Sequence, residues 1–224
     1  SKALTGPHLY AAWESSRSPA AAPATGHGNS PRRSVRDEWE DVGVVVLAGG
    51  RSTRMGADKA QVKVNGTRLV DAVCSLIPDG VPRIVVSPRP LGVPTVSEDP
   101  PFGGPVAGIA AGLSRIDAPF VAVVSVDAPR SPELIPLLAQ RVRDGADVAV
   151  IEAVDGYLQP LCAVWNRTSL VAALDAAGTR DIPAKRLLDA VKSVARVQGT
   201  GAERDYDTRE ELHTLGNVEF PSTE

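Results

Sequence analysis

Short runs of apolar residues alternate along most of this chain with segments whose apolar residues recur at a helical spacing. Because these runs are rich in Val and sharply bounded, they are typical of strands buried on both faces, as in a parallel sheet. The expected strands are 42–47, 83–87, 94–96, 120–126, 147–152, 156–165 and 194–197. The expected helices are 67–77, 105–113, 131–143, 170–177 and 183–191, and a last helix begins at Thr208.

The order of strand, helix and strand predicts βαβ units and a mostly parallel sheet. Residues 156–165 are the exception, and we expect them to run antiparallel at the far side of the sheet. The prediction is therefore an α/β protein in which one domain spans residues 42–215. Residues 216–224 are expected to form a C-terminal tail.

Residues 1–41 differ from the rest, because Ala, Ser and Pro recur and no apolar period is sustained. Such a segment buries too little apolar surface to offset the entropy of ordering it, so we expect a flexible leader. Two tryptophans, Trp13 and Trp39, complicate this interpretation. A short helix from about Val35 to Glu40 would dock part of the leader on the domain.

Composition narrows the class of protein. The 224 residues are 43% hydrophobic and 23% charged, with a formal net charge of −3, so nothing attracts the chain as a whole to nucleic acid or to an anionic membrane. There is no secretory segment and no apolar run of about 18 residues, which predicts a cytoplasmic protein. Cys74 and Cys162 lie within apolar patterns, so we expect buried side chains rather than a thiol nucleophile or metal ligands.

The segment after the first strand carries the chemistry. Adjacent Gly49 and Gly50 allow a tight turn whose N–H groups approach a ligand, and Arg51, Arg54 and Lys59 add positive charge within ten residues. Together they predict a site for a nucleoside triphosphate. The spacing of the glycines is that of neither a P-loop nor a dinucleotide-binding G-x-G-x-x-G motif.

From Leu47 to Lys59 the chain closely resembles the signature L-A-G-G-x-x-x-R-M-G-x-x-K of the molybdenum cofactor guanylyltransferases. The resemblance covers roughly residues 42–215 and implies a three-layer α/β/α, Rossmann-like nucleotidyltransferase fold. It also implies an enzyme of molybdenum cofactor biosynthesis that transfers GMP from GTP to the phosphate of molybdopterin and releases pyrophosphate. The implied cofactor is Mg²⁺.

Two further segments match the family. The sequence from Asp99 through Gly104-Pro105 resembles D-x-x-x-x-G-P, in which the acidic residue contacts guanine. A carboxylate is a suitable acceptor for the N–H groups of that base. Asp127-Ala128-Pro129 follows a predicted central strand and resembles C-D-x-P, whose Asp holds Mg²⁺.

The chain also departs from the family pattern. Ser87 stands where the family has an Asn that touches the nucleoside, and Gln159 replaces a His, which removes an ionisable group. Asp205 and Asp207 replace two Asn residues near the metal. We expect Asp207 to share the metal with Asp127, whereas Asp205 has no assigned role.

The resemblance assigns catalysis to Lys59, Arg54 and Asp127. Lys59 is expected at the α-phosphate and the leaving group, and Arg54 at the β- and γ-phosphates. The residues expected to bind the nucleotide are Leu47, Ala48, Gly49, Gly50, Lys59, Ser87, Asp99 and Asp127.

Three alternatives remain. A related enzyme would use CTP on molybdopterin or GTP on another phosphorylated acceptor, although Gly49, where the cytidylyltransferases tend to have Ala, favours guanine. A protein of another class would bind the nucleotide without turnover, as the departures at Ser87, Gln159, Asp205 and Asp207 suggest. Finally, the leader would recruit a partner, either a cofactor-insertion protein or a molybdoenzyme.

Overall fold

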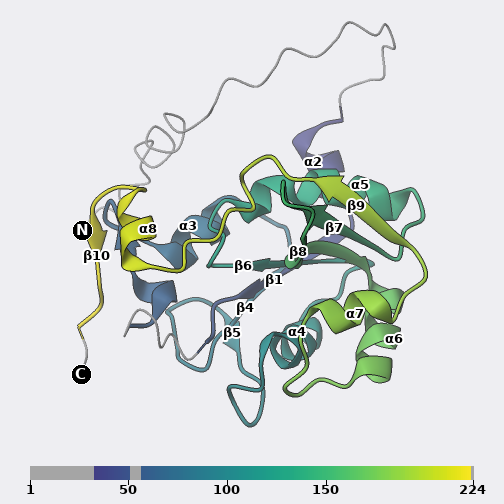
Figure 1. Cartoon of the computed structure of the whole chain (residues 1–224), viewed down its shortest axis with the longest axis horizontal. Helices are drawn as coiled ribbons and strands as arrows, with labels where there is room; N and C mark the ends of the chain where they lie inside the picture. The colour runs from purple at the N-terminus through teal and green to yellow at the C-terminus, as the bar shows by residue number, and fades with distance from the viewer. Residues whose placement is uncertain (1–32, 51–56, 223–224) are drawn as a thin grey trace, which may run out of the picture.

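A computed structural model of the chain describes residues 33–50 and 57–222. Seven strands form one sheet in the order β5-β4-β1-β6-β8-β7-β9 (Figure 1). All of them run parallel except β8, which pairs antiparallel with both β6 and β7. The strands are β1 Val42–Leu47, β4 Arg83–Val86, β5 Thr95–Val96, β6 Phe120–Ser125, β7 Val148–Glu152, β8 Leu158–Asn166 and β9 Val194–Gln198.

Helices cover both faces of the sheet, so the predicted three-layer α/β arrangement is confirmed. Figure 1 shows α2, α3 and α5 on one side and α4, α6 and α7 on the other. The bounds are α2 Val35–Glu38, α3 Leu69–Ser75, α4 Pro105–Leu113, α5 Ile135–Arg143, α6 Arg167–Ala177, α7 Lys185–Asp189 and α8 Arg209–His213.

Alternation along β1 divides the core into two halves. Val44 and Val46 belong to the cluster that packs on α3 and α5, whereas Val45 and Leu47 belong to the cluster that packs on α4, α6 and α7. All six residues of the strand are buried. Because successive side chains point to opposite faces, a strand covered on both sides must be apolar throughout, which is the pattern seen in the sequence.

The position predicted for residues 156–165 is wrong in one respect. The strand β8 is antiparallel, as expected, but it lies inside the sheet between β6 and β7 instead of at its far side. The edge is formed by β9, which pairs parallel with β7. An apolar sequence indicates that a strand is buried, but it does not indicate which strands pair with it.

Three predicted helices begin later than expected, and α7 is the simplest case, because it starts at Lys185 instead of residue 183. Thr67–Arg68 form the short strand β3, so the helix predicted from Thr67 starts at Leu69. Residues Ser131–Leu134 form the 3₁₀ turn η2, and α5 follows it from Ile135. Pro132 and the hydroxyl of Ser131, which donates to the carbonyl of Ala128 at 2.6 Å, account for this irregular start.

A small second sheet is built from β10 Val218–Glu219, β2 Lys63–Val64 and β3, in that order. The segment predicted as a tail thus contributes one strand, which pairs antiparallel with β2. A separate apolar cluster of Val62, Val64, Leu69, Tyr206 and Leu212 packs this sheet against α8.

The short helix expected between Val35 and Glu40 is present as α2. Ser34 caps it, and the guanidinium of Arg143 on α5 donates to the carbonyls of Glu38 and Glu40. Trp39 is only 8% exposed and belongs to the main core. Residues 1–32, the rest of the predicted leader, lie outside the described part of the chain.

Both cysteines behave as apolar side chains. Cys162 is buried in the core, and burial raises the pKa of its thiol to about 12. Burial also raises the pKa of Cys74, which is half-buried at the end of α3. Since the thiolate is the reactive form, neither residue is a nucleophile near neutral pH.

One carboxylate connects three segments at the end of the sheet opposite the predicted nucleotide loop. Asp147, just before β7, accepts hydrogen bonds from the hydroxyl of Ser169 at 2.7 Å and from the N–H groups of Ser193 and Lys192 at 2.9 and 3.2 Å. The Ser169 hydroxyl and the Ser193 N–H hold the pKa of Asp147 below its usual range.

We predict that Asp147→Asn lowers the free energy of unfolding by about 1 kcal/mol at pH 7, because hydrogen bonds to a charged acceptor are lost. The folded-state pKa lies below the unfolded value of about 3.9, so this stabilisation is present above that pH and is lost as the pH falls through the folded pKa. Urea denaturation of both proteins at pH 7 and near pH 3 measures the difference. Asp175→Asn, on the exposed face of α6, is the control and should change stability at neither pH. An equal loss at both pH values would contradict the prediction.

Candidate active site

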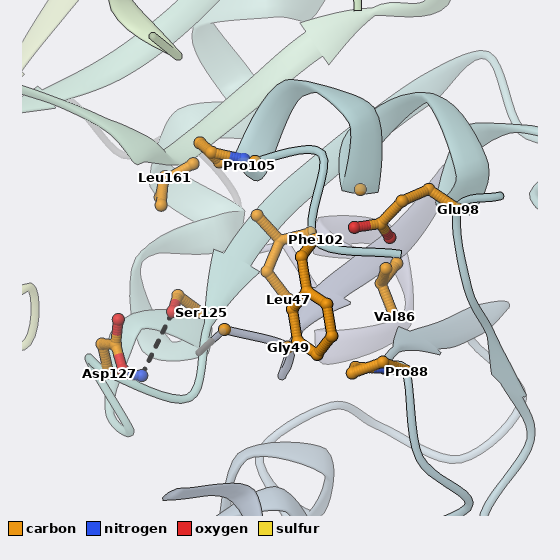
Figure 2. A pocket seen from close by; sticks show the side chains of 13 residues that line it. Leu47, Gly49, Val86, Pro88, Glu98, Phe102, Pro105, Ser125, Asp127 and Leu161 are labelled. Atoms are coloured by element: carbon orange, nitrogen blue, oxygen red, sulfur yellow. Dashed lines mark hydrogen bonds between the residues drawn. The ribbon is translucent and has the colours of Figure 1, made fainter. Parts of the chain in front are cut away.

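A cavity of about 340 Å³ lies at the carboxyl edge of the sheet, where β1, β4 and β6 end (Figure 2). Because parallel strands place their carboxyl ends on the same edge, segments distant in sequence meet there. The residues that line it are Leu47, Gly49, Gly50, Val86, Pro88, Glu98, Phe102, Gly104, Pro105, Gly108, Ser125, Asp127 and Leu161.

The two glycines after β1 have different constraints. A Cβ added at Gly49 would lie 2.9 Å from Cδ of Pro88, in the loop after β4. A Cβ added at Gly50 would meet nothing within 4 Å among the described atoms. Gly49 therefore permits close packing of the two loops that border the cavity. At Gly50 no neighbour among the described atoms covers the position of a Cβ, so a ligand has room to approach the backbone there.

Lys59, Asp127 and Asp207 form one ion cluster, although they are far apart in sequence. The ammonium Nζ of Lys59 lies 2.8 Å from Oδ1 of Asp127 and 3.3 Å from Oδ1 of Asp207. Asp127 lines the cavity, so the ion cluster borders the cavity at this residue. The structure thus brings together the cation and the two carboxylates that the sequence singled out.

Backbone hydrogen bonds hold the two carboxylates in place. The N–H of Asp127 donates to the hydroxyl of Ser125 at 3.1 Å, and its carbonyl accepts from the N–H of Tyr206 at 2.8 Å. On the other side, the Glu211 carboxylate accepts from the N–H of Asp207 at 2.6 Å, in addition to its bond with Thr208 in the capping box that starts α8. The predicted helix start at Thr208 is therefore also what positions Asp207.

A third carboxylate adds negative charge beside the cluster. Partial burial, followed by the Asp207 and Asp127 carboxylates, raises the pKa of Asp205 to about 6, although the Lys59 ammonium opposes the shift. The like charges disfavour a third ionised group in so small a space. Lys59 supplies one positive charge to a cluster that already contains the two carboxylates of Asp127 and Asp207.

The helix α4 begins at the cavity. Gly104 precedes it with φ of +91°, Pro105 is its first residue, and both line the cavity. The aligned peptide dipoles of the helix favour an anion at this end. The predicted helix start and its Gly-Pro signature are observed as expected.

Not every predicted residue reaches the cavity. Ala48 is buried in the core, and the Ser87 hydroxyl accepts from the N–H of Arg89 at 3.1 Å without lining the cavity. Asp99 is exposed and also does not line it. Arg54 and Arg51 lie outside the described residues, so their expected roles are not addressed.

Glu98, Phe102 and Ser125 line the cavity but were not predicted. Figure 2 shows the Glu98 carboxylate turned into the cavity beside Val86, with Asp127 and Ser125 on the other side of Leu47. Glu98 is adjacent to Asp99, and only the conformation of the loop decides which carboxylate faces inward. Ser125 could have been found, because it ends the strand β6 at the carboxyl edge of the sheet, two residues before Asp127.

The loop that carries Glu98 and Phe102 is braced from the other half of the chain. The Arg180 guanidinium, between α6 and α7, donates to the carbonyl of Pro100 at 2.8 Å. The N–H of Asp181 donates to the carbonyl of Gly103 at 2.7 Å. These contacts fix a wall of the cavity that has little secondary structure of its own.

Comparison with known proteins identifies the sequence. Residues 44–196 match the family described as the MobA-like NTP transferase domain. A probable molybdenum cofactor guanylyltransferase of Natronomonas pharaonis is 36% identical over 163 residues, covering 65% of this chain and 80% of that protein. A molybdenum cofactor guanylyltransferase of Bordetella petrii is 36% identical over 148 residues, covering 60% of this chain and 75% of that protein.

Solved structures confirm the nucleotidyltransferase fold. The molybdopterin-guanine dinucleotide biosynthesis protein A of Archaeoglobus fulgidus superposes with a TM-score of 0.61 at 19% identity, over 77% of this chain and 95% of that one. The 2-C-methyl-D-erythritol 4-phosphate cytidylyltransferase of Thermus thermophilus gives 0.59 at 20% identity, over 78% and 96% of the two chains. The same fold thus occurs in proteins named for different nucleotides.

We predict that Gly49→Ala destabilises the ligand-free protein by about 1 kcal/mol or more, because its Cβ would overlap the Pro88 ring and force the two loops apart. Thermal or urea denaturation measures the loss. The matched control is Gly50→Ala, whose Cβ has open space and whose stability should equal that of the parent protein. If the two variants are equally stable, the packing of Gly49 on Pro88 does not constrain the loop.

Proposed function

The chain belongs to the MobA-like NTP transferase family, and we propose on that premise that it is a molybdenum cofactor guanylyltransferase. It would transfer GMP from GTP to the phosphate of molybdopterin and release pyrophosphate. The observation that supports this most strongly is the cluster of Lys59, Asp127 and Asp207 beside the Gly49-Gly50 loop. A cation, two carboxylates and open backbone N–H groups are what a triphosphate and its counter-ion require.

The reaction needs no covalent intermediate on the protein. An oxygen of the acceptor phosphate attacks the α-phosphorus of GTP in line, the bond to the β-phosphate oxygen breaks, and pyrophosphate leaves with the electron pair. Negative charge accumulates on the phosphate oxygens, so catalysis depends on alignment and charge neutralisation. The absence of a reactive thiol at Cys74 and Cys162 is consistent with this chemistry.

Enzymes of this family work with a divalent metal ion, and we propose Mg²⁺. The residues present fit it: Asp127 and Asp207 offer hard oxygen ligands that already share one cation, the Lys59 ammonium. Among the described residues no three acidic, His or Cys side chains form a complete cage. Mg²⁺ commonly binds through one or two carboxylates, with phosphate oxygens and water completing its shell. When bound, it would supply charge that offsets the triphosphate.

The remaining residues have roles that follow from their positions. The N–H groups around Gly49 and Gly50 would hold phosphate oxygens, and Lys59 would bind the α-phosphate and the leaving group. Arg54 would bind the β- and γ-phosphates. For guanine we retain Asp99, with Glu98 as a second candidate acceptor because it lines the cavity.

We place the reaction in the cytoplasm. In residues 33–50 and 57–222 no helix is long and apolar enough to cross a bilayer. GTP and molybdopterin are the proposed substrates. Interaction with cofactor-insertion proteins or molybdoenzymes remains a proposal for residues 1–41.

Nucleotide titrations in the presence of Mg²⁺ test the base. We predict that GTP binds more tightly than CTP, ATP or UTP, because Gly49 and the acidic Glu98-Asp99 loop favour guanine. Isothermal calorimetry with each nucleotide provides the measurement. Tighter binding of CTP would overturn the guanine assignment while leaving nucleotidyl transfer intact.

Variants of the ion cluster test catalysis. Lys59→Ala and Asp127→Ala should each lower pyrophosphate release from GTP and molybdopterin by about 10²–10³-fold, since each removes a group that stabilises the transferring phosphate. The control is Lys63→Ala, an exposed lysine in the same segment, which should retain turnover. Full turnover in either cluster variant would contradict the site. Tight GTP binding without pyrophosphate release by the parent protein would favour the non-catalytic alternative.

A further inference from the structure

The Lys59 ammonium is the most buried member of the ion cluster. Its side chain is only 10% exposed, whereas those of Asp127 and Asp207 are 44% and 50% exposed. A buried ammonium is costly unless it is paired, so the two carboxylates hold it firmly. In the protein without nucleotide, Lys59 is therefore the cation that these carboxylates share.

The same carboxylate pair is the one to which the proposed function assigns the metal. Mg²⁺ binds oxygen at about 2.0–2.1 Å. An ion at that distance from Oδ1 of Asp127 would lie close to the Lys59 ammonium, which is 2.8 Å from the same oxygen. Repulsion between two cations so close together in a partly buried site is strong. The ammonium and the metal therefore compete for these oxygens in this arrangement.

We propose that Lys59 occupies the cation position of Asp127 and Asp207 in the nucleotide-free protein, so that the divalent metal binds there only together with a triphosphate. This inference rests on the proposed function, because it takes its metal and its nucleotide from there. The phosphates give Lys59 an alternative anionic partner. Its departure then leaves the carboxylates to the metal, and the site accepts the metal–nucleotide complex as its substrate.

Charge balance favours this exchange. Two carboxylates paired with one ammonium retain one uncompensated negative charge. A divalent cation neutralises the pair completely, while the displaced ammonium offsets charge on the nucleotide. Both anionic groups are then better compensated than they were separately.

The local structure allows Lys59 to move without changing the backbone. Lys59 is the first residue of the 3₁₀ turn η1, Lys59–Gln61, whose cap is Asp58. The Asp58 carboxylate is occupied by the N–H of Ala60 and the side-chain amide of Gln61, so it does not compete for the ammonium. The flexible four-carbon side chain of Lys59 has several rotatable bonds through which it would redirect its charge toward the phosphates.

Mn²⁺ titration of the nucleotide-free, full-length protein tests the proposal, with free Mn²⁺ followed by electron paramagnetic resonance. We expect weak binding by the parent protein and binding tighter by about tenfold or more in Lys59→Met, which keeps the buried stem but removes the charge. Lys63→Met, at an exposed position on β2, is the matched control and should bind as weakly as the parent. Lys59→Gln provides a second variant should Lys59→Met fail to fold.

Two results would overturn the inference. One is tight, stoichiometric Mn²⁺ binding by the parent protein that Lys59→Met and Lys59→Gln do not increase. The other is a gain in Lys59→Met that persists when Asp207→Asn is added, because the gained site would then lie elsewhere. No nucleotide is present in this titration, so its failure is distinct from that of the proposed function, which the nucleotide preference and pyrophosphate release decide.

Discussion

An ion pair of 2.8 Å between Lys59 and Asp127 joins the segment after β1 to the end of β6, and Asp207 extends it to the start of α8. Three segments separated by up to 148 residues therefore converge on one ammonium. Each is positioned independently, by the turn η1, by the Ser125 hydroxyl and by the capping box of α8. A charge cluster assembled in this way forms only when the whole domain has folded, so the catalytic proposal depends on the complete topology.

Close packing beneath the cavity determines where the N-terminal end of α4 lies. A Cβ on Gly112 would lie 2.5 Å from Val45 on β1, and one on Gly108 would lie 3.2 Å from Leu47. These glycines let the helix approach the strand more closely than other residues would allow. The helix start at Pro105 and the loop at Gly49 are thereby brought to the same cavity. The small residues of α4 thus shape the cavity by setting the distance between α4 and β1, and not by contacting a ligand.

Much of this arrangement was predictable from the sequence, and the failures have physical causes. Strands β1 and β6 are long apolar runs that no helical period explains, so both were correctly located. The position of β8 was wrong because pairing partners depend on long-range register, which apolar pattern does not contain. Asp127 was found from its place after a buried strand. Glu98 and Phe102 were missed because they lie in a loop whose conformation is set by distant Arg180.

The cytidylyltransferase of Thermus thermophilus has a similar backbone, so the fold by itself does not select a base. The loops that border the cavity, which include Gly49 and Glu98, are therefore where we expect the base to be selected. The family match covers residues 44–196, whereas Asp207 lies beyond that range.

The small sheet connects the C-terminal segment with the segment that follows Lys59. The carbonyl of Asn217 accepts from the N–H of Asn65 at 2.7 Å, and its N–H donates to the Asn65 side chain at 2.9 Å, next to the pairing of β10 with β2. Strand β2 begins four residues after Lys59. A truncation that removes β10, or an affinity tag fused close behind Glu219, would therefore disturb the segment that supports Lys59, although the change is made more than 150 residues away.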